Sequence, residues 1–151
     1  MTDYLGQSIG EGVAGKHSHA QLWNPVGSGK NLELTSVRVT FTTWSATPAG
    51  SRAGDFVKTG DALANKLGYA VAADFGDNTL PVAEMRSEAK LPADISGVQP
   101  FYECWIGASE TDRLYQFDKP IIIPPGTGFA VRGAQTAMYI VSAWQWSEEA
   151  I

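Results

Sequence analysis

From residue 20 to the end, the chain is a succession of short segments rich in β-branched and aromatic residues, separated by Gly, Pro, Asp and Asn. Segments of this kind, with turn residues at regular intervals, are typical of antiparallel sheets joined by hairpins. The pattern predicts strands over residues 32–44, 69–75, 79–88, 100–107, 113–117, 120–124, 128–133 and 137–146. The sequence therefore predicts an all-β protein, an antiparallel β-sandwich whose strand count fits a jelly roll best.

Two details refine this expectation. Along residues 32–44 the apolar positions change parity between Leu34 and Val37, which predicts a β-bulge or a strand that crosses between sheets. Residues 120–125 carry three prolines, which lack the N–H that a sheet ladder needs. That segment is therefore expected at a sheet edge or at a bend.

One segment has helical rather than strand character. Residues 45–60 are rich in turn formers, and the sequence DALANKLG follows them. Asp61 is a good N-cap, Leu63 and Leu67 share one helical face, and Gly68 is a typical C-terminal stop. The sequence predicts a short helix over residues 61–67.

The first nineteen residues contain several glycines and little periodicity. We interpret residues 1–19 as an extended N-terminal arm, flexible alone or ordered only against a partner. Residues 20–151 are then a single β-sandwich domain, a size that can bury a real core without disulfides or metals.

Composition narrows the partners. The 151 residues carry a formal charge of −5 with a pI near 4.9, which disfavours binding to nucleic acid. Only 18% of the residues are charged, so part of the surface should be uncharged and suited to contact with other protein. The chain shows neither a secretory signal nor an apolar run long enough to span a membrane, and we expect synthesis in a cytoplasm. No cofactor motif is present.

Residues capable of catalysis do not form a recognisable motif, and we expect no enzymatic activity. Cys104, the single cysteine, lies in an apolar run and is interpreted as a small buried hydrophobe. Glu84 and Arg86 share one face of a strand and are expected to form a pair. General acid and base work by Glu84 with Glu103 is a disfavoured alternative, because carboxylates scattered along strands are usually solvated.

His17 and His19 are spaced as in the metal motif of cupins. That family also needs a Glu a few residues later and a third His, but the matching positions here are Trp23 and Asn24. These two histidines are weak metal candidates, and a cupin-like metal enzyme is the least favoured reading of the chain.

Tryptophans provide the clearest binding candidates. Trp144 and Trp146 lie two apart and so share one face of the last strand, where they could fill the core or form an interface. With Tyr139 they could also stack on sugar rings, which would make the chain a carbohydrate-binding or adhesin-type module of a virion fibre. Trp23, Trp44 and Trp105 are expected in the core.

Three stretches together resemble a recurring pattern in structural proteins of tailed bacteriophages. They are LWNPVGSGKNLELTSVRV, PVAEMRSE and DKPIIIPPGTGFAVRGAQTAMYIVSAWQWSEE. The family resembled is the small jelly-roll cement or decoration proteins of phage heads, which form trimers and clamp neighbouring major capsid subunits. The resemblance implies structural turns at Asn24, Pro25, Gly27, Ser28, Gly29 and Lys30 and at Pro124, Pro125 and Gly126.

If the resemblance holds, the protein is a homotrimeric decoration protein on the capsid surface of a virion, made in the cytoplasm of a host bacterium. Its partner would be the major capsid protein. The arm would lace across a subunit boundary, because a free segment that orders on docking can tie two chains together. The residues expected at the interface are Tyr4, Leu5 and Ile9 of the arm together with Tyr139, Trp144 and Trp146.

Overall fold

The computed structural model of the chain describes residues 2–42, 51–66, 68–91, 98–106 and 112–151. These residues form ten strands, and none of them is helical. The strands are β1 (Asp3–Gly10), β2 (His17–Asn24), β3 (Lys30–Thr42), β4 (Ser51–Thr59), β5 (Gly68–Ala72), β6 (Glu84–Lys90), β7 (Gln99–Ile106), β8 (Asp112–Ile123), β9 (Thr127–Thr136) and β10 (Tyr139–Ala150).

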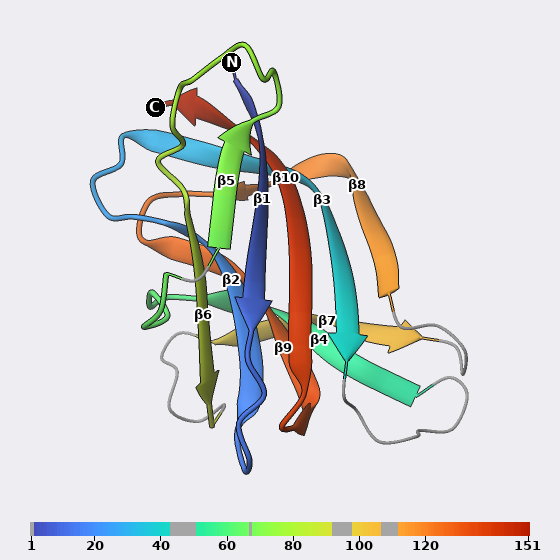
Figure 1. Cartoon of the computed structure of the whole chain (residues 1–151). Coiled ribbons are helices and arrows are strands. Elements are labelled where there is room, and N and C mark those ends of the chain that lie inside the picture. Colours follow the sequence, from blue (N-terminus) through green and yellow to red (C-terminus); the bar gives the residue numbers. More distant parts are fainter. Residues whose placement is uncertain (1, 43–50, 67, 92–97, 107–111) are drawn as a thin grey trace.

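Two five-stranded antiparallel sheets pack face to face, which confirms the predicted all-β sandwich. Sheet A has the order β5-β1-β10-β3-β8, and sheet B has the order β6-β2-β9-β4-β7. Sheet A lies in front in Figure 1, with β9, β4 and β7 of sheet B passing behind it. Consecutive strands repeatedly fall in different sheets, so most of the ladders join segments that are far apart in the sequence.

The core fills the space between the two sheets. Strand alternation sends every second side chain inward, and these inward positions carry most of the large apolar residues. Phe56 and Phe129 approach with ring centroids 5.0 Å apart, and Trp144 packs edge-on against Phe129 at 5.5 Å. Other fully buried side chains are Tyr4, Leu22, Leu32, Leu34, Phe41 and Trp146.

The N-terminal residues differ from the expected arm. Asp3–Gly10 is an interior strand of sheet A, paired with β10 on one side and with β5 on the other. Tyr4 stacks on Trp146, and Ser8 donates a hydrogen bond to the carbonyl of Arg86. Gly6 gives Trp146 its space, because a Cβ there would lie 2.9 Å from the indole ring. A glycine that suggests flexibility in the sequence is in fact a packing position.

The short helix predicted over residues 61–67 is absent from residues 61–66, and residue 67 lies outside the described residues. The backbone of this segment is bound to sheet B instead. Leu63 donates its N–H to Oε1 of Gln21, and its carbonyl accepts a hydrogen bond from Nη1 of Arg86. Asn65 forms an isolated bridge with Ser87. Since tertiary partners take these backbone groups, helical propensity does not decide the conformation.

Two irregularities follow the sequence pattern. The parity change in β3 coincides with a register shift at Thr35, and Leu34 before it and Val37 after it are both buried, so of the two predicted alternatives the structure has the bulge. The proline-containing strand β8 is an edge strand of sheet A, also as predicted. Residues 51–59, interpreted as turn-rich, instead form β4 in the interior of sheet B. Ladders to β7 and β9 on both sides hold this segment extended.

Candidate functional site

An apolar face lies on the outside of sheet A, over β5, β1 and β10. Its members occupy the outward positions of these strands, opposite in parity to the core residues. Leu5 is paired with Val71 of β5, and Ile9 is paired with Val141 of β10. We call this set the apolar face and define it as Leu5, Ile9, Tyr69, Val71, Tyr139 and Val141.

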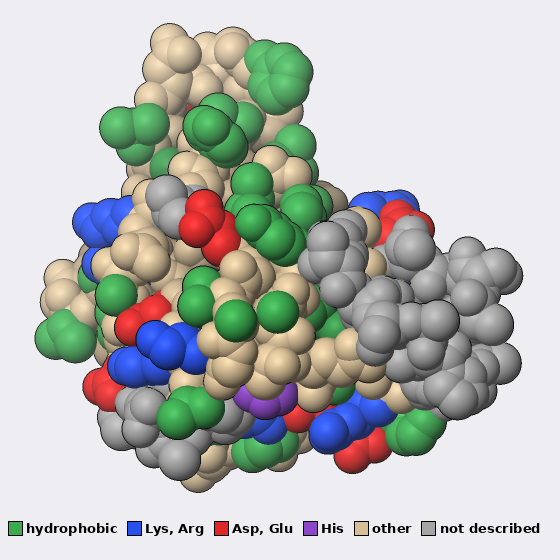
Figure 2. Space-filling model, turned by 60° about the horizontal axis from the view of Figure 1, so that its bottom comes forward, with side chains coloured by type: hydrophobic (Ala, Val, Ile, Leu, Met, Phe, Trp, Pro, Cys, Tyr) green, Lys and Arg blue, Asp and Glu red, His purple; other side chains and the backbone are tan. Residues whose placement is uncertain are grey.

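Several of these side chains are strongly exposed. Tyr69 is 75% exposed, Val71 52% and Leu5 38%, although each lies on a regular strand. A shallow depression of about 250 Å³ runs between them, lined by residues 5–7 and 69–71. Figure 2 shows this side of the molecule obliquely in its upper part, where hydrophobic side chains stand among uncharged ones and most of the charged side chains lie lower.

Charge is absent from the centre of this face. The outward positions beside the apolar residues carry Gln7, Ala143 and Gln145. The ion pair between Arg38 and Asp112, at 3.0 Å, lies beyond them on β3 and β8. An exposed apolar surface without central charge, bordered by polar groups, is the composition of a protein-binding surface.

The structure divides the six expected interface residues by strand parity. Leu5, Ile9 and Tyr139 belong to the apolar face. The other three point to the opposite side of sheet A, into the core. Trp144 and Trp146 are each 1% exposed, and Tyr4 stacks on Trp146. Tyr69 and Val71 of β5 were not among the expected interface residues, although they alternate with Ala70 and Ala72 in the sequence as residues on one face of a strand do.

The other tryptophans also divide. Trp23 is buried, as expected, and Trp44 lies outside the described residues. Trp105, expected in the core, is half-exposed on the edge strand β7, where its Nε1 donates to Glu103. An edge strand has a neighbour on one side only, so its outward side chains remain in contact with solvent.

The turn residues surround one buried amide. Asn24 donates from Nδ2 to the carbonyls of Lys30 and Ile123, and its Oδ1 accepts from the hydroxyl of Ser28. Its own carbonyl accepts the N–H of Gly126. Asn24 therefore fastens the turn after β2 to the turn after β8. Positive φ angles, which glycine adopts without strain, occur at Gly27, Gly29 and Gly126, within the turns that contain Pro25, Pro124 and Pro125.

The two histidines lie on β2 rather than in an arm. Nδ1 of His17 is bonded to the carbonyl of Gly133 at 2.7 Å, and Nδ1 of His19 to the carbonyl of His17 at 2.9 Å. His19 is opposite Glu88 of β6 and Arg132 of β9. Within the described ranges no three His, Cys, Asp or Glu side chains are grouped so that they could hold a metal ion.

Burial makes His19 sensitive to acid. Desolvation, helped by the charge of Arg132, lowers the pKa of His19 from its usual 6.5 to about 4, against hydrogen bonds to the backbone that act to raise it. Between about pH 4 and 6.5, His19 is therefore mostly neutral in the folded protein but protonated in the unfolded chain. The stability that depends on neutral His19 is present above pH 6.5 and is lost as the pH falls through about 4.

We expect the difference in unfolding free energy between the native protein and His19→Gln to change by about 3 kcal/mol between pH 7 and pH 4. Because glutamine does not titrate, the variant should lose less stability on acidification. Chemical denaturation at a series of pH values measures this difference, and NMR of the imidazole Cε1 proton follows the titration directly. A His19 midpoint near 6.5 in the folded protein would contradict the expectation.

Nucleophilic and acid–base chemistry have no favourable site among the candidates. Burial raises the pKa of the Cys104 thiol to about 12, so the thiolate is scarce at neutral pH. Glu84 pairs with Arg86 at 2.8 Å, which confirms the predicted pair. Glu103 lies on β7, whereas Glu84 lies on β6, and these are opposite edges of sheet B. The two carboxylates are therefore too widely separated to act on one substrate.

Interactions with Lys66 and Arg86 fix the ionisation of Glu84. Desolvation acts to raise the pKa of Glu84, but hydrogen bonds and charge from Lys66 and Arg86 outweigh it, so the pKa lies below its ordinary value. Such a carboxylate stays ionised and is occupied by its partners. The arrangement stabilises the β6 edge and does not resemble a poised general acid.

Comparison with protein-family models, with curated proteins and with solved structures found no match. The described residues contain no helix of the length and apolarity that crossing a membrane requires. The fold and the apolar face therefore define the chain as a β-sandwich with a surface suited to protein contact.

Proposed function

We propose that this protein is a structural protein of a phage virion, a decoration protein that binds major capsid subunits through the apolar face. The observation that carries the proposal is the exposure of Leu5, Tyr69 and Val71 on regular strands with no charged residue between them. The resemblance of the turn and strand motifs to phage cement proteins supports the identity of the partner.

The physical argument for a protein partner rests on desolvation. Apolar side chains on a flat sheet gain free energy when another surface covers them, roughly 25 cal/mol for each Å² removed from water. Strands β5, β1 and β10 hold these side chains in place, so docking orders few groups that were mobile before. A rigid apolar face is thus well suited to a permanent position in an assembly.

We further propose that the sandwich is a jelly roll. Strands β5 and β6 both lie between β4 and β7 in the sequence, and each occupies an edge of one sheet. Without these two, the sheets have the orders β1-β10-β3-β8 and β2-β9-β4-β7. Eight strands divided between two sheets in this interleaved way correspond to the winding of a jelly roll, with β5 and β6 as an inserted pair.

A trimer is the proposed form on the capsid surface. A closed ring of three copies would present three equivalent apolar faces to a lattice site with three equivalent subunits. Linked contacts of this kind raise the overall affinity far above that of one face, without any new contact. After synthesis in the host cytoplasm, the protein would join the assembled head and keep neighbouring subunits from separating.

The glycan-binding alternative is not favoured, because it needs neighbouring aromatic rings in contact with solvent. Of the three rings named for it, those of Trp144 and Trp146 are buried between the sheets. Tyr139 is exposed, but a single ring does not form a stacking platform with them.

The proposal predicts that a charge placed on the apolar face strongly weakens capsid binding. We expect Leu5→Glu and Val71→Glu each to weaken co-sedimentation with empty capsids that lack this protein by at least about tenfold, because an unpaired carboxylate would be buried. Val26→Glu is the matched control, since Val26 is 84% exposed in the turn after β2, away from the face. Circular dichroism checks the fold of each variant.

Light scattering on a sizing column reports the oligomeric state of the same samples. A trimer of the native chain with unchanged mass in the variants would locate the defect in capsid contact. If Leu5→Glu and Val71→Glu bind capsids as well as Val26→Glu and the native protein do, the apolar face is not the docking surface. If the native protein does not sediment with capsids at all, the decoration function itself is wrong.

A further inference from the structure

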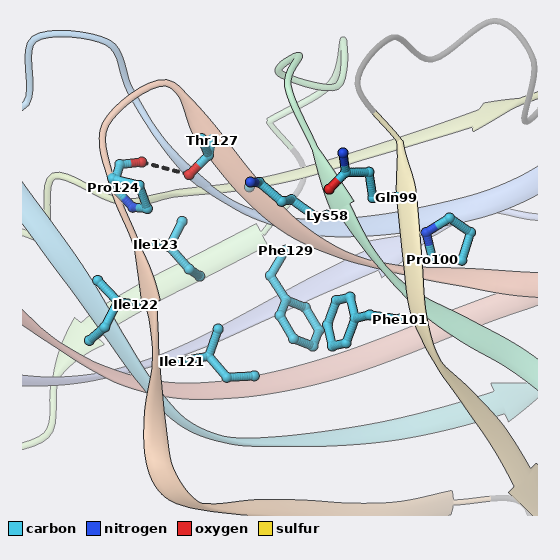
Figure 3. Close-up of a pocket in the computed structure, with 11 residues that line it drawn as sticks. Lys58, Gln99, Pro100, Phe101, Ile121, Ile122, Ile123, Pro124, Thr127 and Phe129 are labelled. Carbon is cyan, nitrogen blue, oxygen red and sulfur yellow. Dashed lines mark hydrogen bonds between the residues drawn. The ribbon is translucent and has the colours of Figure 1, made fainter.

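A groove opens at the side of the sandwich where both sheets end, between β7 of sheet B and β8 of sheet A. It encloses about 740 Å³, within the range of sites for small molecules. Figure 3 shows the rings of Phe101 and Phe129 side by side in its interior, with Ile121, Ile122 and Ile123 along the wall that β8 forms. The groove lies away from the apolar face and has no part in the proposed capsid contact.

Aromatic rings form the interior of this groove. Phe129 is buried and contacts Phe101 edge-on at 5.3 Å, and it also packs against Phe117 at 6.1 Å. Phe101 is half-exposed because β7 is an edge strand with no further strand to cover it. The sandwich thus leaves part of its interior surface accessible along this side.

The charge in the groove occupies a position that strand alternation directs inward. Leu22, Phe129 and Lys58 are opposite one another on β2, β9 and β4, and Leu22 is a fully buried core residue. The same row continues to Gln99 of β7. A lysine therefore stands on the core side of sheet B at the point where the core becomes open to solvent.

Of the lining residues that the structure describes, Lys58 is the only cation, and it has no ion pair with any described residue. The described residues that line the groove include no carboxylate, so none of them compensates the charge of the ammonium group. The other polar side chains in this described lining are those of Gln99 and Thr127, which Figure 3 shows near Lys58. An apolar channel with one unpaired cation is complementary to an apolar chain that carries one anionic group.

The edge strands beside the groove are poorly suited to pairing with an added peptide strand. Pro120 and Pro124 bracket the part of β8 that borders the groove, and Pro100 lies in the facing part of β7. Proline has no N–H to offer to an added strand, so these edges are blunted. The accessible features are side chains rather than ladder groups.

We propose that the groove is a binding site for a free medium- or long-chain carboxylate, with the hydrocarbon chain between Phe101 and Ile121 and the carboxylate at Nζ of Lys58. Contact with the aromatic rings supplies apolar burial, and the ammonium group fixes the orientation of the ligand. This binding site does not depend on the proposed role of the protein in a virion.

Decanoate is the probe that tests the proposal, below its micelle concentration, with decyltrimethylammonium and decan-1-ol as chains of equal length but different charge. Calorimetric titration of the native protein should give saturable binding of decanoate that is at least about tenfold tighter than that of the cationic analogue. Amide shifts in ¹H–¹⁵N spectra should be largest in residues 99–101 and 121–123.

Lys58→Met keeps an unbranched stem and removes the charge. It should weaken decanoate binding about tenfold or more while leaving the affinity for decan-1-ol within about twofold. Lys16→Met, at an exposed position before β2, is the matched control and should bind decanoate as the native protein does. Thermal melting checks that both variants are folded.

Four results would overturn the proposal. The first three are the absence of saturable decanoate binding, equal affinity for decanoate and its cationic analogue, and amide shifts that centre outside the groove. Equal loss in Lys58→Met and Lys16→Met would also contradict it, since the attraction would then arise from overall charge.

Discussion

Replacing Trp144 with alanine is expected to lower the free energy of unfolding by about 4 kcal/mol. The indole is 1% exposed, lies between the two sheets, and packs edge-on against Phe129. Alanine would leave a large cavity at the centre of the sandwich, because rigid strands on both sides cannot close around it. Urea denaturation followed by circular dichroism measures the loss, as tryptophan fluorescence would be altered by the substitution itself.

Two further variants test whether the loss in Trp144→Ala comes from core packing. One keeps an aromatic ring at position 144, and the other removes a tryptophan at the surface. Trp144→Phe should cost clearly less, about 1–2 kcal/mol, because it keeps an aromatic ring and removes an Nε1–H that has no hydrogen-bond partner among the described residues. Trp105→Ala, on the half-exposed side chain of β7, should cost less than about 1 kcal/mol. Equal losses in Trp144→Ala and Trp105→Ala would contradict the core position of Trp144.

Replacing Glu148 with alanine is expected to cost about 3 kcal/mol. Oε2 of this buried carboxylate accepts the N–H of Val82, and Oε1 accepts those of Ala83 and Trp146 Nε1, all within 3.2 Å. Nζ of Lys30 lies 3.6 Å from Oε2. Removing the acceptor leaves two backbone donors and an indole donor without partners, and each such loss is costly in a buried site.

The neighbouring carboxylate provides the control for this experiment. Glu149 is exposed, and Glu149→Ala should change stability by no more than about 0.5 kcal/mol. Amide hydrogen exchange adds a local readout, because the N–H groups of Val82 and Ala83 should exchange faster in Glu148→Ala alone. Unchanged protection of these two amides would show that Glu148 does not hold the segment before β6.

The candidate site illustrates how far alternation can carry a prediction. The spacing of Trp144 and Trp146 correctly predicts that they share one face of the last strand, but it does not say whether that face lies in the core or at an interface. Leu5 and Ile9 were expected at an interface as residues of an arm. They do lie on the outer face of sheet A, but as part of the interior strand β1. The direction in which a strand faces depends on what covers it, and period-2 spacing is the same for either direction.

Other features were invisible locally. His19 and Cys104 have shifted pKa values because distant strands bury them, and the groove exists because β7 and β8 are both edges. Lys58 is exposed in the structure as well, and its pairing with Phe129 places it on the core side of sheet B, which the sequence does not show. The largest cause of each pKa shift is burial by strands that are distant in the sequence.

By itself, the sequence determined the elements that depend on neighbouring residues. Proline, asparagine and glycine in the segments around Asn24 and Gly126 end one strand and begin another, and the parity change around Thr35 limits that strand to a bulge or a crossing between sheets, of which the structure has the bulge. Tertiary structure alone decided which strands became neighbours. The hydroxyl of Ser142 reaches the carbonyl of Ser8 across 134 residues of chain, and such pairings turned the expected arm into β1 and the expected helix into a segment bound to sheet B. Local propensities are worth about 1 kcal/mol per residue or less, whereas paired ladders and core burial contribute more, so long-range contacts prevailed wherever the two disagreed.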